Sequence, residues 1–335
     1  MDHAVRTAVL GTGMYVPPKV VTNDDLSKRM TTTDEWIVER TGISERRYTE
    51  GEVGASDLAR EAALAACRDA GMEPSGIDLI IFATLSPDYG FPGSGVLLQA
   101  KLGLKDVPAL DVRNQCSGFL YGLSTADAFI RTGQYMRVLL VGAEVHSTGL
   151  DFSDAGRDVT VLFGDGAGAV VLGPVPADAG RGVLVTRLHA DGSHAKDLWL
   201  EAPASRMAPR ISKEMIDEGR HFPKMNGKRV FVDAVRAMPA VVHECLAAAG
   251  LAIGDVDLFI AHQANLRICA AVQERLGLPD EKVFNNIQRY GNTTAGSIPI
   301  ALHEAVAAGR LQKGGLLCLA AFGSGYTWSG ALIRW

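Results

Sequence analysis

The 335-residue chain has little of what marks secreted, metal-binding or membrane-spanning proteins. Its five cysteines are odd in number and show neither a CxxC spacing nor a Cys/His ligand spacing, which argues against a disulfide framework and against a metal site. No apolar run approaches the roughly 20 residues that span a bilayer, and no secretory leader pattern opens the chain. We therefore expect a cytoplasmic protein without a membrane partner.

Positive charge and aromatic side chains are also scarce. Lysine and arginine total 33 against 38 aspartate and glutamate residues, a formal net charge of −5, which argues against nucleic acid as a partner. Aromatic residues make up 7% of the chain, whereas there are 37 glycines, which favours helices packed closely on sheets. A hydrophobic fraction of 47% is typical of a globular protein. The chain is also long enough to form two packed halves.

Strand-like runs such as DLIIFATL alternate with helix-like stretches such as SDLAREAALAACRDAG, the pattern of parallel βαβ units. The segment AGMEPSGIDLIIFA (70–83) matches AGLAIGDVDLFIAH (249–262) at an offset of 179 positions. The same offset aligns Gly13 with Gly192 and Val138 with Leu317. We therefore expect a duplicated α/β unit, residues 1–175 and 176–335, with two sheets and helices between and outside them.

Three residues that could act as a nucleophile or as hydrogen-bond donors lie in glycine-rich or amide-rich stretches: Cys116, His262 and Asn292. Each is predicted at the carboxyl end of a strand, where α/β sheets bind ligands, and the duplication makes those ends face one another. Cys116 precedes a helix-like segment, whose dipole would lower the thiol pKa and whose free N–H groups could hold an oxyanion. A soft nucleophile with two neutral hydrogen-bond donors suits carbon–carbon bond formation from thioesters.

Taken singly, each of the three has a plainer explanation. Cys116 would be an inert core cysteine, His262 a satisfied core or loop residue, and Asn292 a turn residue. The combination argues for an enzyme, whereas the other four cysteines keep the plain interpretation.

The chain resembles the β-ketoacyl-acyl-carrier-protein synthase III family of the thiolase-like superfamily. The resemblance runs nearly end to end and rests on six segments: DEWIVERTGISERR (34–47), DVRNQCSGFLYGL around Cys116, FGDGAGAVVLG (163–173), HQANLRI (262–268), GNTTAGSIP (291–299) and AFGSGYTW (321–328). It implies a thiolase-like fold with a layered α-β-α-β-α core, one half carrying the cysteine and the other the histidine and asparagine.

The resemblance also implies a mechanism. Cys116 would take the acyl group of an acyl-CoA, with its own N–H and that of Gly325 as the oxyanion hole. His262 and Asn292 would donate hydrogen bonds to a malonyl thioester, with malonyl-acyl carrier protein as the expected donor, while CO2 leaves. CoA and phosphopantetheine thioesters would be substrates, and no cofactor is expected.

A ligand tunnel and a second subunit follow from the same resemblance. Trp36 could stack on the adenine of CoA, and Arg40 and Arg157 could contact its phosphates, although an interface aromatic and solvated charges explain them equally well. Phe91 would reach across a homodimer interface into the partner's acyl pocket. The residues expected along the pantetheine path and its wall are Asn265, Arg267, Met225, Gly227 and Phe231.

Three features leave the substrates open. Gln115, beside the nucleophile, could reshape the acyl pocket or bind a polar acyl group. An expanded segment, 202–224, is either a lid or a surface insertion. Docking of an acidic acyl carrier protein needs cations, and Glu274 stands where a basic residue is expected; the candidates are Arg267, Arg275, Lys224, Lys228 and Arg229.

Four other functions compete with this one. A thiolase would need a second catalytic cysteine near the last glycine-rich turn, where this chain has Gly-Ser-Gly. A chalcone-synthase-like enzyme is usually longer and lacks the FGDGAGA and GNTTAGSIP context. An acyltransferase or specialised-metabolite ketosynthase could use the same cysteine with a different acceptor. A non-catalytic thiolase-fold subunit would be expected to lose one of the three residues.

Overall fold

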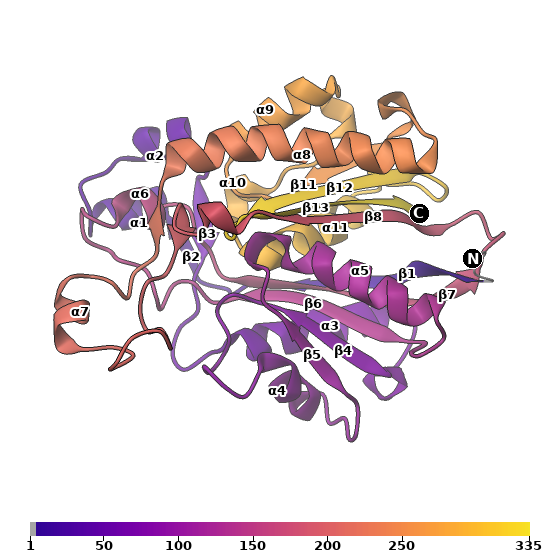
Figure 1. The fold of residues 1–335 in the computed structure, drawn as a ribbon, viewed down its shortest axis with the longest axis horizontal. Helices are drawn as coiled ribbons and strands as arrows, with labels where there is room; N and C mark the ends of the chain where they lie inside the picture. Colours follow the sequence, from indigo (N-terminus) through magenta and orange to yellow (C-terminus); the bar gives the residue numbers. More distant parts are fainter. Residues whose placement is uncertain (1–4) are drawn as a thin grey trace.

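Two β-sheets lie between layers of helices in the computed structural model, which describes residues 5–335 (Figure 1). The first sheet has the strand order β1-β7-β6-β4-β5, and the second has the order β11-β12-β13-β8. The first comprises β1 (Val5–Tyr15), β4 (Leu79–Ala83), β5 (Ala109–Val112), β6 (Val138–Glu144) and β7 (Gly166–Pro176). The second comprises β8 (Gly182–Ala190), β11 (Leu258–Ala261), β12 (Leu316–Gly323) and β13 (Thr327–Arg334).

The helices form the other layers of an α-β-α-β-α stack (Figure 1). One outer layer holds α3 (Ala55–Asp69) and α4 (Ser94–Lys101), and the other holds α8 (Gly227–Ala249) and α9 (Leu266–Leu276). Between the sheets lie α5 (Gly118–Arg131) and α11 (Ser297–Ala307). The expected layered architecture is therefore present.

Shorter elements connect the main strands and helices of the stack. The short helices are α1 (Asn23–Ser27), α2 (Asp34–Thr41), α6 (Arg157–Thr160), α7 (Lys213–Asp217) and α10 (Ile287–Tyr290). Two small sheets pair β2 (Val20–Thr22) with β3 (Glu45–Arg47) and β9 (Leu198–Trp199) with β10 (Lys224–Met225). The 3-10 turns are η1 (Pro74–Gly76), η2 (Gln115–Ser117), η3 (Gly192–His194), η4 (Ile253–Asp255), η5 (Asp280–Lys282) and η6 (Thr294–Gly296).

The offset of 179 positions seen in the sequence also relates equivalent structural elements of the two halves of the chain. It carries the start of β4 onto the start of β11, and the start of α5 falls on the start of α11. It also carries the whole of η2 onto the whole of η6. The turn that holds Cys116 and the turn that follows Asn292 are therefore equivalent positions of the repeat.

Small residues let α3 lie directly on the first sheet. The helix buries a stripe of alanines against β1, and the Asp57 carboxylate accepts a hydrogen bond from the Gly54 N–H to cap its first turn. A Cβ at Gly13 would lie 2.2 Å from the Ala62 carbonyl oxygen. The abundance of glycine and alanine is therefore a packing requirement of this layer.

All five cysteines are unpaired and buried. Within residues 5–335, no helix combines the length and apolarity that crossing a bilayer demands.

The close approach of α3 to β1 predicts the effect of one methyl group. Gly13→Ala should lower the free energy of unfolding by about 1–3 kcal/mol, because the helix backbone must move away from the strand. Denaturant unfolding followed by circular dichroism measures this. Gly254→Ala is the matched control, since nothing lies within 4 Å of its added Cβ. Equal midpoints for the two variants would contradict the packing argument.

Candidate active site

Cys116, His262 and Asn292 line one cavity of about 1070 Å³. Cys116 lies in η2 just before α5, His262 directly follows β11, and Asn292 precedes η6 and α11. Their exposed fractions are 7%, 1% and 5%. The structure thus brings together three residues from both halves of the chain, as the sequence pattern predicted.

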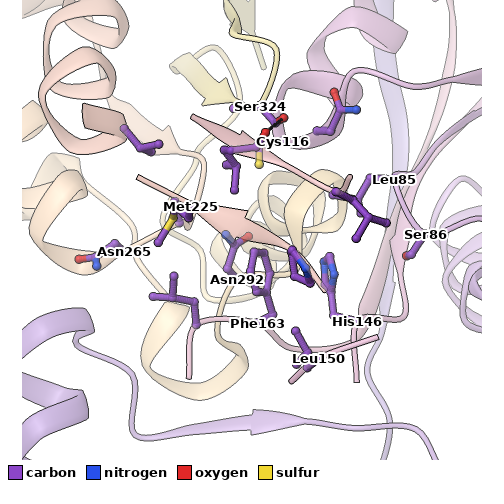
Figure 2. Close-up of a pocket in the computed structure, with 18 of the residues that line it drawn as sticks. Leu85, Ser86, Cys116, His146, Leu150, Phe163, Met225, Asn265, Asn292 and Ser324 are labelled. Carbon is purple, nitrogen blue, oxygen red and sulfur yellow. Dashed lines mark hydrogen bonds between the residues drawn. The ribbon is translucent and has the colours of Figure 1, made fainter. Parts of the chain in front are cut away.

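The glycine-rich turn 323–325 presses against the nucleophile. A Cβ at Gly323 would lie 3.0 Å from the Cys116 sulfur, so a larger residue would displace it. The Ser324 N–H donates a hydrogen bond to the thiol, and Ser324 lines the cavity beside Cys116 (Figure 2). Gly325, the donor expected from the sequence, follows one position later in the turn and is not among the residues that line this cavity. The N–H group that faces the thiol from this turn is therefore that of Ser324.

The protonation of Cys116 differs from the expectation of a lowered pKa. Burial and the nearby Glu144 carboxyl raise the pKa of the Cys116 thiol to about 12, although the N–H groups of Ser324 and Cys116 act in the opposite direction. The α-helix itself begins at Gly118, after the 3-10 turn. Burial therefore outweighs the two N–H groups, which favours the thiol form of Cys116 at neutral pH.

His262 is held as a neutral ring. Burial lowers the pKa of this imidazole to about 3. Its Nδ1 lies 2.6 Å from the Ser297 hydroxyl, which also accepts a hydrogen bond from the Gln263 N–H at 3.3 Å. The Ser297 proton is then free to point at Nδ1, which leaves the imidazole proton on Nε2. In the described chain Nε2 is buried and has no partner, so it can donate to a ligand.

Asn292 is held so that its side-chain N–H groups have no hydrogen-bond partner among residues 5–335. Its Oδ1 accepts a hydrogen bond from the Thr294 N–H at 2.8 Å. Its backbone N–H donates to Leu162 O at 2.8 Å, and its carbonyl accepts from the Gly164 N–H at 3.1 Å. Because the carbonyl oxygen of the side chain is occupied, the Nδ2 group is the part left to meet a ligand.

A buried carboxyl group, Glu144, lies behind the nucleophile and was not singled out from the sequence. It accepts hydrogen bonds from Thr84 Oγ1 at 3.0 Å, from the Leu85 N–H at 3.1 Å and from Ser86 Oγ at 2.5 Å. Burial nevertheless raises the pKa of Glu144 to about 7. A charged residue that ends an apolar strand run, RVLLVGAEV, was the available signal.

Most of the predicted tunnel residues line the same cavity. They are Trp36, Arg40, Met225, Gly227, Phe231, Asn265 and Arg267, and Gln115 joins them. Two predicted residues are placed differently. Arg157 is not among the residues that line the cavity, although its guanidinium and that of Arg40 each lie 4.4 Å from the Trp36 ring centroid. Phe91 is 85% exposed and is likewise absent from the cavity lining.

The segment 202–224 extends away from the stack around α7 (Figure 1). Of its residues, His221 and Pro223 line the cavity. Lys224, its last residue, pairs with Trp199, which lies just before the segment.

The raised thiol pKa predicts how Cys116 reacts with iodoacetamide. Between pH 6 and pH 9 the rate of alkylation should rise about tenfold per pH unit, because the thiolate fraction does so far below the pKa. Intact-protein mass spectrometry measures the rate, with Cys116→Ala as the control for other cysteines. A plateau above pH 7 would show a thiol activated by the helix terminus instead.

Comparison with known proteins assigns the chain. The family model described as 3-oxoacyl-[acyl-carrier-protein (ACP)] synthase III matches residues 110–192, and the model of its C-terminal part matches residues 246–335. A β-ketoacyl-[acyl-carrier-protein] synthase III of Xanthomonas campestris is 48% identical over 335 residues, which cover 100% of both chains.

Solved structures agree with these matches. The 3-oxoacyl-[acyl-carrier-protein] synthase III of Aquifex aeolicus has a TM-score of 0.89 and 44% identity, covering 98% of this chain and 100% of its own. The priming β-ketosynthase of the R1128 polyketide pathway has a TM-score of 0.87 and 33% identity, covering 98% and 96%. The chain belongs to the β-ketoacyl-acyl-carrier-protein synthase III family.

Proposed function

We propose that this enzyme joins an acyl-CoA primer to a malonyl thioester by decarboxylative Claisen condensation, with malonyl-acyl carrier protein as the donor. The observation that carries the proposal is the pairing of two neutral donors, His262 Nε2 and Asn292 Nδ2, in the cavity that holds Cys116. The enzyme is accordingly an acyltransferase that starts fatty-acid synthesis or a related pathway in a reducing cytoplasm.

In the first step the Cys116 sulfur attacks the thioester carbonyl carbon of the primer. The carbonyl π electrons move to oxygen, and the N–H groups of Cys116 and Ser324 stabilise that oxyanion. The carbonyl then re-forms as the C–S bond to CoA breaks, and CoA leaves with the thiol proton. A new thioester to Cys116 replaces the old one.

In the second step the malonyl C–C bond breaks and CO2 leaves. The electron pair passes into an enolate, whose oxygen accepts hydrogen bonds from His262 and Asn292. Because both donors are neutral, they stabilise the enolate without protonating its carbon. That carbon attacks the acyl group on Cys116, and the C–S bond breaks to give the β-ketoacyl thioester and the Cys116 thiolate. The thiolate then takes one proton from solvent and returns to the thiol.

The carrier protein would approach the end of the cavity that holds Lys228 and Arg267. The other cations named from the sequence have partners within the chain. Lys224 pairs with Glu201 at 3.1 Å, Arg229 pairs with Asp233 at 2.6 Å, and Arg275 donates to the Val235 carbonyl at 3.2 Å. Lys228 and Arg267 are therefore the cations proposed to meet the phosphate of the carrier arm.

A second copy of the chain would cover the exposed apolar side chains around β5. This strand is at the edge of its sheet. Phe91, Tyr89 and Leu110 are exposed around it. We propose a homodimer with this edge in its interface.

We also propose that the segment 202–224 acts as a mobile lid beside the cavity.

A specialised-metabolite ketosynthase is the second candidate. Gln115, held at φ +45°, and Arg113 both line the cavity, which gives the region around the nucleophile polar groups. Such a pocket suits a primer other than a simple alkyl chain, while the condensation remains the same.

The acylation and condensation steps can be separated by variants. Incubation with acyl-CoA should add the acyl mass to Cys116, and Cys116→Ala should abolish the adduct. Asn292→Ala should still be acylated, but CO2 release from malonyl thioester should fall by roughly 10²-fold, as for loss of an oxyanion donor. Intact mass and CO2 capture measure the two steps. If the acylated wild-type enzyme releases no CO2 from malonyl thioester, the protein is an acyltransferase without condensing activity, which would contradict the proposal.

Ser297 is predicted to position His262 rather than to touch substrate. Ser297→Ala removes the partner of Nδ1, so the ring can carry its proton on the wrong nitrogen, and condensation should fall roughly tenfold. Acylation of Cys116 should be unchanged, which provides an internal control. An equal loss in both steps would indicate general damage to the fold instead.

A further inference from the structure

A second buried histidine, His146, lines the cavity and has no part in the condensation described above. It follows the end of β6, is 8% exposed, and its backbone N–H donates to Asp165 Oδ1 at 2.7 Å. The Nε2 atom lies 2.7 Å from the Thr294 hydroxyl oxygen. The ring packs against Phe163 with centroids 4.6 Å apart. His146 is therefore held firmly in the wall of the cavity.

The position of His146 is on the side of Cys116 away from the pantetheine path. In Figure 2, Met225 and Asn265 lie on one side of Cys116 and Asn292, whereas Leu85, Ser86 and His146 lie on the other. If the pantetheine arm reaches Cys116 past Met225 and Asn265, the acyl group extends toward His146. This step rests on the proposed function.

The neighbouring polar groups are already occupied. Glu144 accepts hydrogen bonds from Ser86 and Leu85, and the Ser86 hydroxyl also accepts from the Val145 N–H at 3.0 Å. Asp165 accepts from the backbone and hydroxyl of Ser147 and from Thr49. These groups are hydrogen-bonded within the protein and have little hydrogen-bonding capacity left for a ligand.

The Nδ1 atom of His146 differs from them. Among the described residues it has no hydrogen-bond partner, and it is not one of the polar atoms sealed from solvent, as His262 Nε2 is. Burial lowers the pKa of His146 to about 4, so the ring is neutral at pH 7 despite Asp165. A neutral ring nitrogen can donate or accept one hydrogen bond, depending on its tautomer.

The charge of the surroundings limits the class of acyl group. A carboxylate on the primer would enter a buried pocket next to Glu144, whose pKa burial has already raised, so a second negative charge is disfavoured there. A purely alkyl primer would leave His146 Nδ1 desolvated and without a partner, which costs binding free energy.

We propose that His146 determines primer specificity by hydrogen bonding to an uncharged polar substituent, such as a hydroxyl group, on the acyl chain of the primer. Gln115, at the nucleophile, widens the polar part of the same pocket.

Matched substrate pairs test this proposal. The pairs are butyryl-CoA with 3-hydroxybutyryl-CoA, and benzoyl-CoA with hydroxybenzoyl-CoA, and the readout is the rate of Cys116 acylation by intact mass. The wild-type enzyme should prefer the hydroxylated member of at least one pair by roughly tenfold. His146→Leu should reverse that preference, and His146→Gln, which retains hydrogen-bonding groups, should keep it.

The outcomes are distinguishable. Two results would contradict the role of His146 and leave the proposed function intact. One is a wild-type enzyme that favours the unsubstituted member of both pairs. The other is an equal ratio of acylation rates within each pair for the wild type and His146→Leu. If no acyl-CoA modifies Cys116, the proposed function itself fails and this inference fails with it. Should His146→Leu not fold, the wild-type ratios and His146→Gln still decide the question.

Discussion

The chemistry of this protein depends on the exclusion of water from the junction between its two sheets. Burial disfavours every charged form there: it lowers the pKa of His262 and raises those of Cys116 and Glu144. The result is a site in which Cys116 and His262 are neutral at rest. Hydrogen bonds from such groups are stronger in a dry site, and the carboxylate of the proposed malonyl donor is closer to losing CO2 once it loses its hydration.

The duplication explains how one site can draw on both halves of the chain. The turns η2 and η6 are equivalent in the repeat and lie against each other at the centre of the stack. One has become the nucleophile turn and the other the turn that orients Asn292. The packing of η6 against β6 needs glycine, since a Cβ at Gly142 would lie 2.2 Å from the Ala295 carbonyl oxygen.

The layers and the convergence of Cys116, His262 and Asn292 could be predicted, because strand periodicity and a constant offset report on topology. Details that depend on burial could not. The thiol pKa was expected to fall, but only the folded chain shows how strongly burial and Glu144 raise it. The N–H group that faces Cys116 belongs to Ser324, one residue before the expected Gly325, since the direction of an N–H group in a glycine-rich turn is set by backbone angles.

Residues that act through others were missed for a related reason. Ser297 and Glu144 have no signature of their own and gain meaning from the atoms they contact. His146 lies in a stretch whose sequence gives no sign of a cavity, and Phe91 gains its expected role only beside a second subunit.

The protonation of His262 in the resting enzyme tests the account most directly. Nitrogen-15 NMR of the histidine-labelled protein, assigned with His262→Gln, reports which ring nitrogen carries a proton at each pH. The account predicts a neutral ring with its proton on Nε2 from pH 5 to pH 8. An imidazolium that titrates near pH 6.5, or a neutral ring protonated on Nδ1, would contradict it.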